Sequence, residues 1–266
     1  MRRLAALLIA APLALAAPAS GGDDAALAAP EQFYVEYSGS VYFLQVADIS
    51  ITARLDNGTY SSAATFQSAG LLRWFDDTDI HASSVGYRSG DGLAPWRYEH
   101  INRASDKGRV VGIDFPDGTA TPDIDPPFGS MGEPPASEAE RAGALDPISV
   151  ILKLMLGPID PGDDAVCSGR LPVFDGKARY DLRFENLGMD EVRTRAYRGE
   201  AIRCQAYVEP ISGYDPGDRP TEEEVARPVN IWLVERDGVH LPVRFRASTQ
   251  IGAISIEARR IGTGGA

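Results

Sequence analysis

The sequence predicts a mainly β protein, in which an antiparallel curved sheet or half-barrel is wrapped around one buried helix. Two observations support this prediction. Short runs rich in β-branched and aromatic residues follow one another from residue 31, and turn signals such as Asp56-Asn57-Gly58 and Asp237-Gly238 separate them. Strands joined by short turns pair antiparallel, and strong helical periodicity is confined to residues 147–156.

The N-terminal half is expected to form a meander of strands, followed by a long loop. The strands are predicted at Phe33–Tyr37, Val41–Ile51, Thr59–Phe66, Ile80–Gly86, Pro95–Asn102 and Arg109–Phe115. Residues 116–144 carry closely spaced prolines, glycines and acids. Because proline breaks helices and central strands, this segment is predicted to be a loop that separates two β-rich halves.

The clearest helix signal begins at Asp146-Pro147. An aspartate caps free amide groups at a helix start, and proline fits the first helical position. Apolar residues then recur at helical spacing until Gly157-Pro158 ends the helix. Because this helix is so apolar, it is expected to pack against the sheet. The alternative is that it binds a lipid or a partner.

The C-terminal half returns to strands. They are predicted at Ala165–Val173, Ala178–Asn186, Glu191–Glu209, Asn230–Arg236, Leu241–Ser248 and Ala253–Arg260. A loop rich in prolines and acids, Pro210–Arg227, interrupts them. The whole chain is therefore expected to hold about eleven strands.

The first residues are typical of a secretory signal peptide. Arg2 and Arg3 precede an apolar run from Leu4 to Ala17, and small residues follow. That run is too short to span a bilayer, so no stable membrane anchor is expected. The predicted organisation is a signal peptide at 1–19, a flexible tail at 20–30 and a single β-rich domain at 31–262, in the periplasm or secreted.

The composition narrows the choice of partners. Thirty-eight acidic residues against 26 lysines and arginines give a net charge of −12. A negative surface argues against nucleic acid and anionic lipid headgroups as main partners. The chain has two cysteines, Cys167 and Cys204. In an exported protein they are expected to form one disulfide, and the alternative is a redox or metal pair, which their spacing does not favour.

Motifs for catalysis, metal ligation or phosphate binding are missing from the sequence. It has no nucleophile elbow, no zinc-binding helix signature and no calcium-loop pattern, so no catalytic residue, cofactor or metal is predicted. Large apolar residues are the remaining candidates for lining a ligand cavity between sheet and helix, with ordinary core packing as the alternative. These are Leu71, Leu72, Trp74, Phe75, Trp96 and Ile151.

The segments that start at Phe174-Asp175-Gly176-Lys177, at Cys204-Gln205-Ala206-Tyr207 and at Pro210-Ile211-Ser212-Gly213-Tyr214 carry a family resemblance. Together with Asp146-Pro147-Ile148-Ser149 and Leu241-Pro242-Val243-Arg244, they resemble the exported bacterial family DUF-3108, over about residues 31–260. The family has no established activity to carry over. A curved sheet around a helix, as in bacterial lipoprotein carriers, is an analogous fold.

Two functions remain open from the sequence. The favoured one is an exported, non-enzymatic periplasmic protein that binds an apolar, lipid-like ligand or a polypeptide, or maintains the envelope. The alternative is a carboxylate-dependent hydrolase that uses Asp175 and Glu185, with Pro210–Arg227 as a lid. A close acid pair in a concave pocket would favour the enzyme, and a continuous apolar cavity would favour the carrier. The sequence sets no oligomeric state.

Overall fold

The fold was analysed in a computed structural model, which describes residues 31–70, 73, 77–90, 92–106, 108–158, 166–249 and 252–264. The predicted signal peptide and tail lie outside the described residues. So do four of the six candidate ligand-lining residues, namely Leu71, Leu72, Trp74 and Phe75.

The described strands form one antiparallel sheet of 13 strands, in the order β7-β6-β5-β4-β3-β2-β1-β13-β12-β11-β10-β9-β8. Strand β1 pairs with both β2 and β13, so the two ends of the domain meet in the middle of the sheet. The first seven strands are β1 Gln32–Val41, β2 Leu44–Asp56, β3 Thr59–Ser68, β4 Asp79–Ser89, β5 Gly92–Asn102, β6 Val110–Asp114 and β7 Thr121–Asp125. The last six are β8 Gly169–Phe174, β9 Arg179–Arg193, β10 Arg198–Ser212, β11 Val229–Arg236, β12 Val239–Thr249 and β13 Gly252–Thr263.

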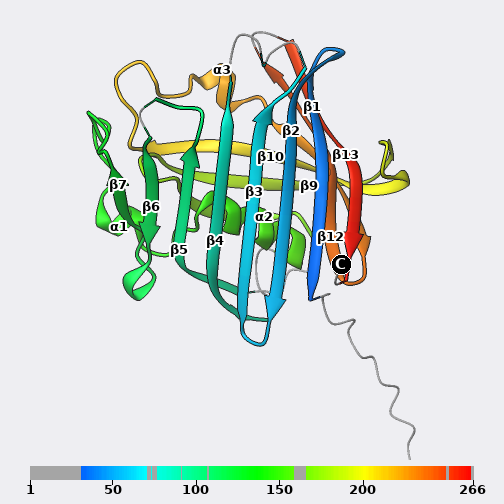
Figure 1. The fold of residues 1–266 in the computed structure, drawn as a ribbon, viewed down its shortest axis with the longest axis horizontal. Coiled ribbons are helices and arrows are strands. Elements are labelled where there is room, and N and C mark those ends of the chain that lie inside the picture. Colours follow the sequence, from blue (N-terminus) through cyan, green and yellow to red (C-terminus); the bar gives the residue numbers. More distant parts are fainter. Residues whose placement is uncertain are drawn as a thin grey trace, which may run out of the picture.

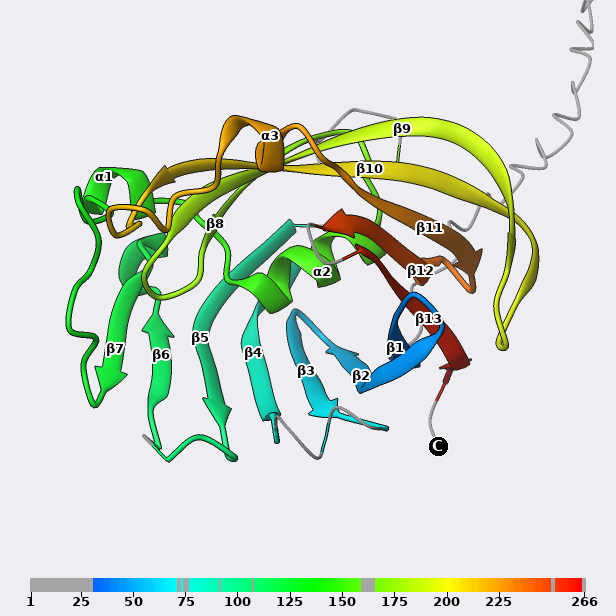
Figure 2. The ribbon, with the colours of Figure 1, turned by 90° about the horizontal axis from the view of Figure 1, so that it is seen from above.

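The sheet curves strongly but does not close into a barrel, because β7 and β8 stand at its two ends without pairing to each other. Strands β1–β7 run side by side, whereas β9 and β10 cross behind them at a large angle (Figure 1). Seen from above, the sheet arches around helix α2, Pro147–Leu156 (Figure 2). The predicted curved sheet around one buried helix is confirmed.

Helix α2 is apolar on nearly all sides because it packs against both halves of the sheet. Leu152 and Met155 belong to a core cluster that also contains Phe33 and Tyr37 of β1. Val150 and Leu154 belong to a second cluster, which includes both cysteines. A helix with apolar residues all round is typically buried, and seven of its ten residues are. The partner-binding alternative for this helix is therefore not needed to explain its sequence.

The described residues form 13 strands where about eleven were predicted, and two of the predicted strands run across turns that carry no turn signature. The predicted strand Val41–Ile51 is broken at Tyr42-Phe43, where β1 turns into β2. The predicted strand Glu191–Glu209 contains the turn from β9 to β10, at residues 194–197. In both places the residues favour strands locally, so the reversal is set by the pairing of the flanking strands.

The segment 116–144, expected to be one loop, instead contains three short elements. They are the 3₁₀ helix η2 Pro116–Gly118, strand β7 and helix α1 Glu138–Arg141. Strand β7 tolerates Pro122 because it is an end strand, where a missing amide costs no ladder hydrogen bond. Helix α1 starts at a capping box made by Ser137 and Glu140. The predicted loop Pro210–Arg227 likewise holds the end of β10 and helix α3 Glu222–Val225.

Cys167 and Cys204 are bonded to each other, as predicted, across a sequence separation of 37 residues. A disulfide of this loop length stabilises a fold by roughly 4 kcal/mol in the chain-entropy estimate. It ties the residues just before β8 to the middle of β10, within the second core cluster. Among the described helices, none has the length and apolar character needed to cross a membrane.

Candidate functional site

A closed polar cluster joins helix α2 to the sheet, and we call it the helix anchor: Tyr60, Ser84, Asp146 and Ser149. The Asp146 carboxylate accepts hydrogen bonds from the amides of Ile148 and Ser149, at 3.0 and 2.9 Å. It also accepts from the hydroxyls of Ser84 and Ser149, at 2.8 and 2.6 Å. Tyr60 of β3 completes the cluster through a 2.7 Å bond between its hydroxyl and that of Ser149.

The helix anchor is a structural device rather than a ligand site. Asp146 is fully buried, and burial raises the pKa of its carboxyl, although its hydrogen-bond donors oppose that shift. Burial also raises the pKa of Tyr60 to about 12. Every polar side chain of the cluster is hydrogen-bonded within it, and the cluster is buried, so the fold itself satisfies these groups.

The two described ligand-lining candidates do not share a pocket. Ile151 packs against the main core cluster. Trp96 stands at an irregularity in the β4–β5 pairing, is 40% exposed, and meets Tyr87 edge-on at 4.6 Å between ring centroids. A bulge turns a side chain away from the face that strict alternation assigns it, which explains why Trp96 points outward.

Three segments from distant parts of the chain cross at one place, which we call the seam: residues 130–141, 175–179 and 212–215. Gly213 has a φ of +84°, and a Cβ atom there would lie 2.0 Å from the carbonyl oxygen of Lys177. Its amide donates to the carbonyl of Pro134, at 2.9 Å, and the Glu133 amide donates to the carbonyl of Tyr214, at 2.9 Å. Only glycine allows backbones to approach this closely.

Charged side chains reinforce the seam. The Arg179 guanidinium donates to the carbonyl oxygen of Glu140, at 2.7 Å, and the Ser212 hydroxyl donates to the Glu140 carboxylate, at 3.1 Å. Asp215 accepts from both Lys177 and Ser130, and these bonds, that to Lys177 foremost, lower the pKa of its carboxyl. The seam therefore fastens the proline-rich segment to the second half of the sheet, at the β8–β9 turn and the end of β10.

Beside the seam lies an open cleft of about 340 Å³, which we call the seam cleft. It is lined by His100, Phe128, Asp175, Lys177, Ala178, Gly213, Tyr214, Asp215 and Asp218. The Nδ1 atom of His100 is hydrogen-bonded to the Tyr98 hydroxyl at 3.0 Å, and Asp175 Oδ1 accepts from two backbone amides of its own turn. Within the described residues, no hydrogen bond reaches His100 Nε2, Asp175 Oδ2 or the Tyr214 hydroxyl.

The seam cleft combines aromatic walls with a negative charge. Burial lowers the pKa of His100, only partly offset by Asp175, so the imidazole is neutral at pH 7. Three aspartates and one lysine line the cleft, Asp215 is already paired with Lys177, and the Arg219 guanidinium lies 5.8 Å from the centre of the Tyr214 ring. The Phe128 ring is approached by the guanidinium of Arg109 at 4.5 Å and the ammonium of Lys177 at 6.0 Å. Such surroundings favour a ligand that carries positive charge or hydrogen-bond donors.

The acid pair that would support a hydrolase is not assembled. Asp175 lies in the turn between β8 and β9, and Glu185 stands six residues beyond the first residue of β9, in an ion pair with Arg183. At 3.3 Å per residue, six residues of strand separate the two by about 20 Å. Carboxylates that work as a pair in hydrolysis lie within about 10 Å of each other.

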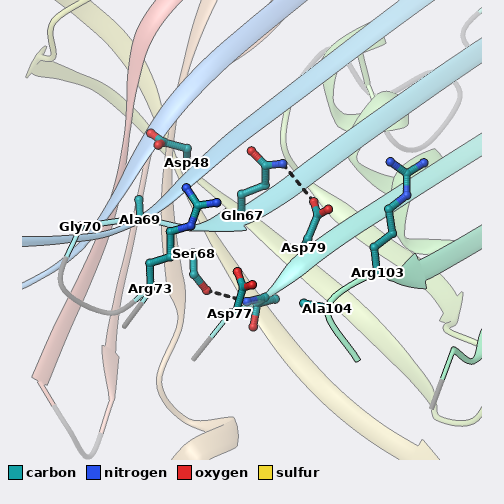
Figure 3. Close-up of a pocket in the computed structure, with 11 residues that line it drawn as sticks. Asp48, Gln67, Ser68, Ala69, Gly70, Arg73, Asp77, Asp79, Arg103 and Ala104 are labelled. Atoms are coloured by element: carbon teal, nitrogen blue, oxygen red, sulfur yellow. Dashed lines mark hydrogen bonds between the residues drawn. The ribbon is translucent and has the colours of Figure 1, made fainter. Parts of the chain in front are cut away.

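A second pocket, of about 360 Å³, lies at the end of β2–β5, and we call it the end pocket (Figure 3). It is lined by Asp48, Gln67, Ser68, Ala69, Gly70, Arg73, Asp77, Thr78, Asp79, Arg103 and Ala104. Gln67 donates to Asp79 at 3.0 Å, and the amide of Thr78 donates to the Ser68 hydroxyl at 3.0 Å. Its walls are mainly polar, so it is not the apolar cavity that the sequence suggested.

Sequence reasoning did not predict the seam cleft, although two of its residues stand in segments that the sequence analysis singled out. Asp175 and Tyr214 lie in the segments that carry the family resemblance. Nothing in the sequence singles out His100, and only the fold places it in one cleft with Asp175. Phe128 stands in the proline-rich segment, where composition gave no signal.

The architecture defines the class as an open, barrel-like β protein built around a buried helix. The chain belongs to the family described as "Protein of unknown function (DUF3108)", whose sequence profile matches residues 32–259. No curated protein matches the chain.

The solved structures that match this chain include two from bacteria. The first is a beta-barrel-like protein of the domain of unknown function DUF1849 from Brucella abortus, with a TM-score of 0.50 and 7% identity, over 89% of this chain and 99% of that one. The second is a hypothetical protein from Chlamydia trachomatis, with a TM-score of 0.39 and 7% identity, over 89% of both chains. At such identity, the first likeness concerns the fold alone.

Proposed function

We propose that the protein is an exported, non-enzymatic binding protein of the bacterial envelope, and that it holds a cationic segment of polypeptide in the seam cleft. One observation carries the proposal. Three polar atoms from three distant segments, His100 Nε2, Asp175 Oδ2 and the Tyr214 hydroxyl, line one cleft without a partner among the described residues. Polar groups that a fold brings together and leaves unpaired are available to a ligand.

The geometry favours a polypeptide over an apolar ligand. Helix α2 occupies the concave face of the sheet, where a lipid-like ligand would otherwise lie. In the seam cleft, by contrast, Asp175 and Asp218 have no ion-pair partner among the described residues. Phe128 and Tyr214 supply aromatic walls, and arginines of the protein itself, Arg109 and Arg219, already lie against these rings. An arginine or lysine side chain satisfies both features, since its cation pairs with carboxylates and its stem packs on aromatic rings.

Binding of matched peptides tests the proposal. We expect a fluorescein-labelled peptide with one arginine to bind the purified protein at least fivefold more tightly than its citrulline analogue, which lacks the charge. The variant Asp175→Asn keeps the oxygen that accepts from the turn amides but loses the charge, and it should abolish this preference. The control Asp56→Asn removes an exposed charge from the distant β2–β3 turn and should preserve it.

Equal affinity of the parent protein for both peptides would rule out the seam cleft as a cation site. So would an equal loss of the preference for the arginine peptide in Asp175→Asn and in the control Asp56→Asn. Native mass spectrometry of protein taken from the periplasm provides an unbiased complement. A co-purifying peptide mass supports the proposal, and a lipid-like mass would favour the carrier function instead.

A further inference from the structure

The β1–β2 turn exposes three consecutive large apolar side chains, and we call it the apolar turn: Tyr42, Phe43 and Leu44. Their exposed fractions are 69%, 88% and 49%. Two-residue turns of this kind usually hold asparagine, aspartate or glycine, because the backbone must enter the left-handed region. Tyr42 has a φ of +55°, which is strained for a bulky residue. Phe43, at 88% exposure, contributes little to the fold or to solubility, so a role outside the fold explains it better.

Neighbouring strands hold the apolar turn in place. The Tyr42 amide donates to the carbonyl oxygen of Ala253 on β13, at 3.1 Å. A Cβ atom on Gly252 would lie 2.4 Å from the Tyr42 ring, so this glycine leaves the space that the ring fills. Tyr42 is thus seated against β13, and Phe43 projects from the end of the sheet.

The end pocket lies at the same end of the sheet as the apolar turn. The Ala69 amide donates to the carbonyl oxygen of Val46, at 2.9 Å, and a Cβ atom on Gly70 would lie 2.5 Å from the carbonyl oxygen of Gln45. Gln45 directly follows Leu44 in the chain. Ala69 and Gly70 both line the end pocket, so one wall of the pocket packs against the backbone that directly follows the apolar turn.

The end pocket offers charges of both signs. Arg73 and Arg103 lie on opposite sides of it, with Asp77 and Asp79 between them (Figure 3). Asp48 and Asp79 are already bonded, to Arg259 and to Gln67. Within the described part of the chain, neither Arg73 nor Asp77 forms an ion pair or side-chain hydrogen bond. The pair fits a small group that carries an anion and an ammonium together.

We propose that the apolar turn docks on a bilayer of zwitterionic phospholipid, and that the end pocket receives a phosphoethanolamine headgroup. In this arrangement Arg73 pairs with the phosphate, Asp77 accepts from the ammonium, and Phe43 enters the interfacial layer. Aromatic side chains favour that layer, because it combines apolar and polar surroundings. The net charge of −12 disfavours anionic membranes and leaves zwitterionic ones accessible. This inference is independent of the seam cleft.

Co-sedimentation with vesicles tests the proposal. The purified protein is mixed, at physiological ionic strength, with vesicles of phosphatidylethanolamine and phosphatidylcholine in equal amounts. We expect Phe43→Ser to lower the vesicle-bound to free ratio roughly tenfold or more, the scale for burying one aromatic side chain. Leu44→Ser should lower it less. Met189→Ser is the matched control, because Met189 is 60% exposed on β9 and should not contribute.

A separate experiment tests the headgroup site in the end pocket. Arg73→Gln should lower the bound-to-free ratio severalfold, and soluble phosphoethanolamine should lower it for the parent protein but not for this variant. Unchanged vesicle binding by Arg73→Gln would overturn the headgroup site.

The docking proposal is overturned if the parent protein stays in solution or if Phe43→Ser binds vesicles as the parent does. It is also overturned if Met189→Ser lowers vesicle binding as much as Phe43→Ser does. Pelleting without vesicles would assign the turn to contacts between copies and also overturn it. Tyr214→Phe should bind vesicles as the parent does, which separates this outcome from that of the seam cleft.

Discussion

The helix anchor and the seam cleft are both polar clusters assembled from distant segments, yet they differ in how completely their groups are paired. In the helix anchor, Asp146 accepts four hydrogen bonds and is fully buried. In the seam cleft, His100, Asp175 and Tyr214 each keep a polar atom without a partner among the described residues. A closed network stabilises the fold, whereas an open one is available to a ligand.

The largest expected effect is loss of the anchor carboxylate. Asp146→Ala removes the helix cap and leaves buried donors of Ser84, Ile148 and Ser149 unpaired. We expect the free energy of unfolding to fall by about 4 kcal/mol. Urea denaturation measures it, with Asp56→Asn as an exposed control. A loss below about 1 kcal/mol would contradict the assignment of Asp146 as the anchor.

The next largest effect on stability is expected from the hydrogen bond between Tyr60 and Ser149 in the helix anchor. Tyr60→Phe deletes the hydroxyl that bonds Ser149 at 2.7 Å and leaves the ring in the core. We expect a loss of about 1 kcal/mol in the free energy of unfolding. A double-mutant cycle with Ser149→Ala should show that the two changes are not additive, and strict additivity would refute the bond's contribution.

The stability of the protein should also depend on the charge of the histidine in the seam cleft. Burial lowers the pKa of His100 in the folded state below its ordinary value of 6.5. As the pH falls, His100 is therefore protonated in the unfolded chain before it is protonated in the folded protein. The contribution of neutral His100 to stability is complete above pH 6.5 and is lost between pH 6.5 and the pKa of His100 in the folded protein.

Thermal unfolding at pH 7.5 and pH 5 measures this dependence. His100→Gln should reduce the drop in Tm between the two pH values without removing it, because burial lowers the pKa of His240 as well. An unchanged or larger drop in the variant would show that His100 does not lose its proton on folding.

The smallest effect on stability is expected for Tyr214→Phe, which allows the seam cleft to be compared directly with the helix anchor. Tyr214→Phe makes the same chemical change as Tyr60→Phe, but its hydroxyl has no partner among the described residues. We expect the free energy of unfolding to change by less than about 0.5 kcal/mol, while affinity for the arginine peptide falls severalfold. A stability loss equal to that of Tyr60→Phe would show that the hydroxyl is structural, and the two clusters would no longer differ in kind.

Several features were predictable from short stretches of sequence. The helix over 147–156 follows from its cap, its first proline, its apolar spacing and its terminal glycine. The pairing of Cys167 with Cys204 followed from their number. The Tyr42-Phe43 turn was not predictable, because both residues favour strands and only the pairing of β1 with β2 reverses the chain there.

The sequence by itself therefore determined the fold class, the buried helix and the disulfide, since each depends on residues close together or on a simple count. Only the tertiary structure decided that Asp146 meets Ser84 and Tyr60 inside the core. It also decided that His100 faces Asp175 and Tyr214 across the seam cleft. Such meetings depend on strand order and sheet curvature, which are set by the packing of the whole chain and leave no trace in local composition.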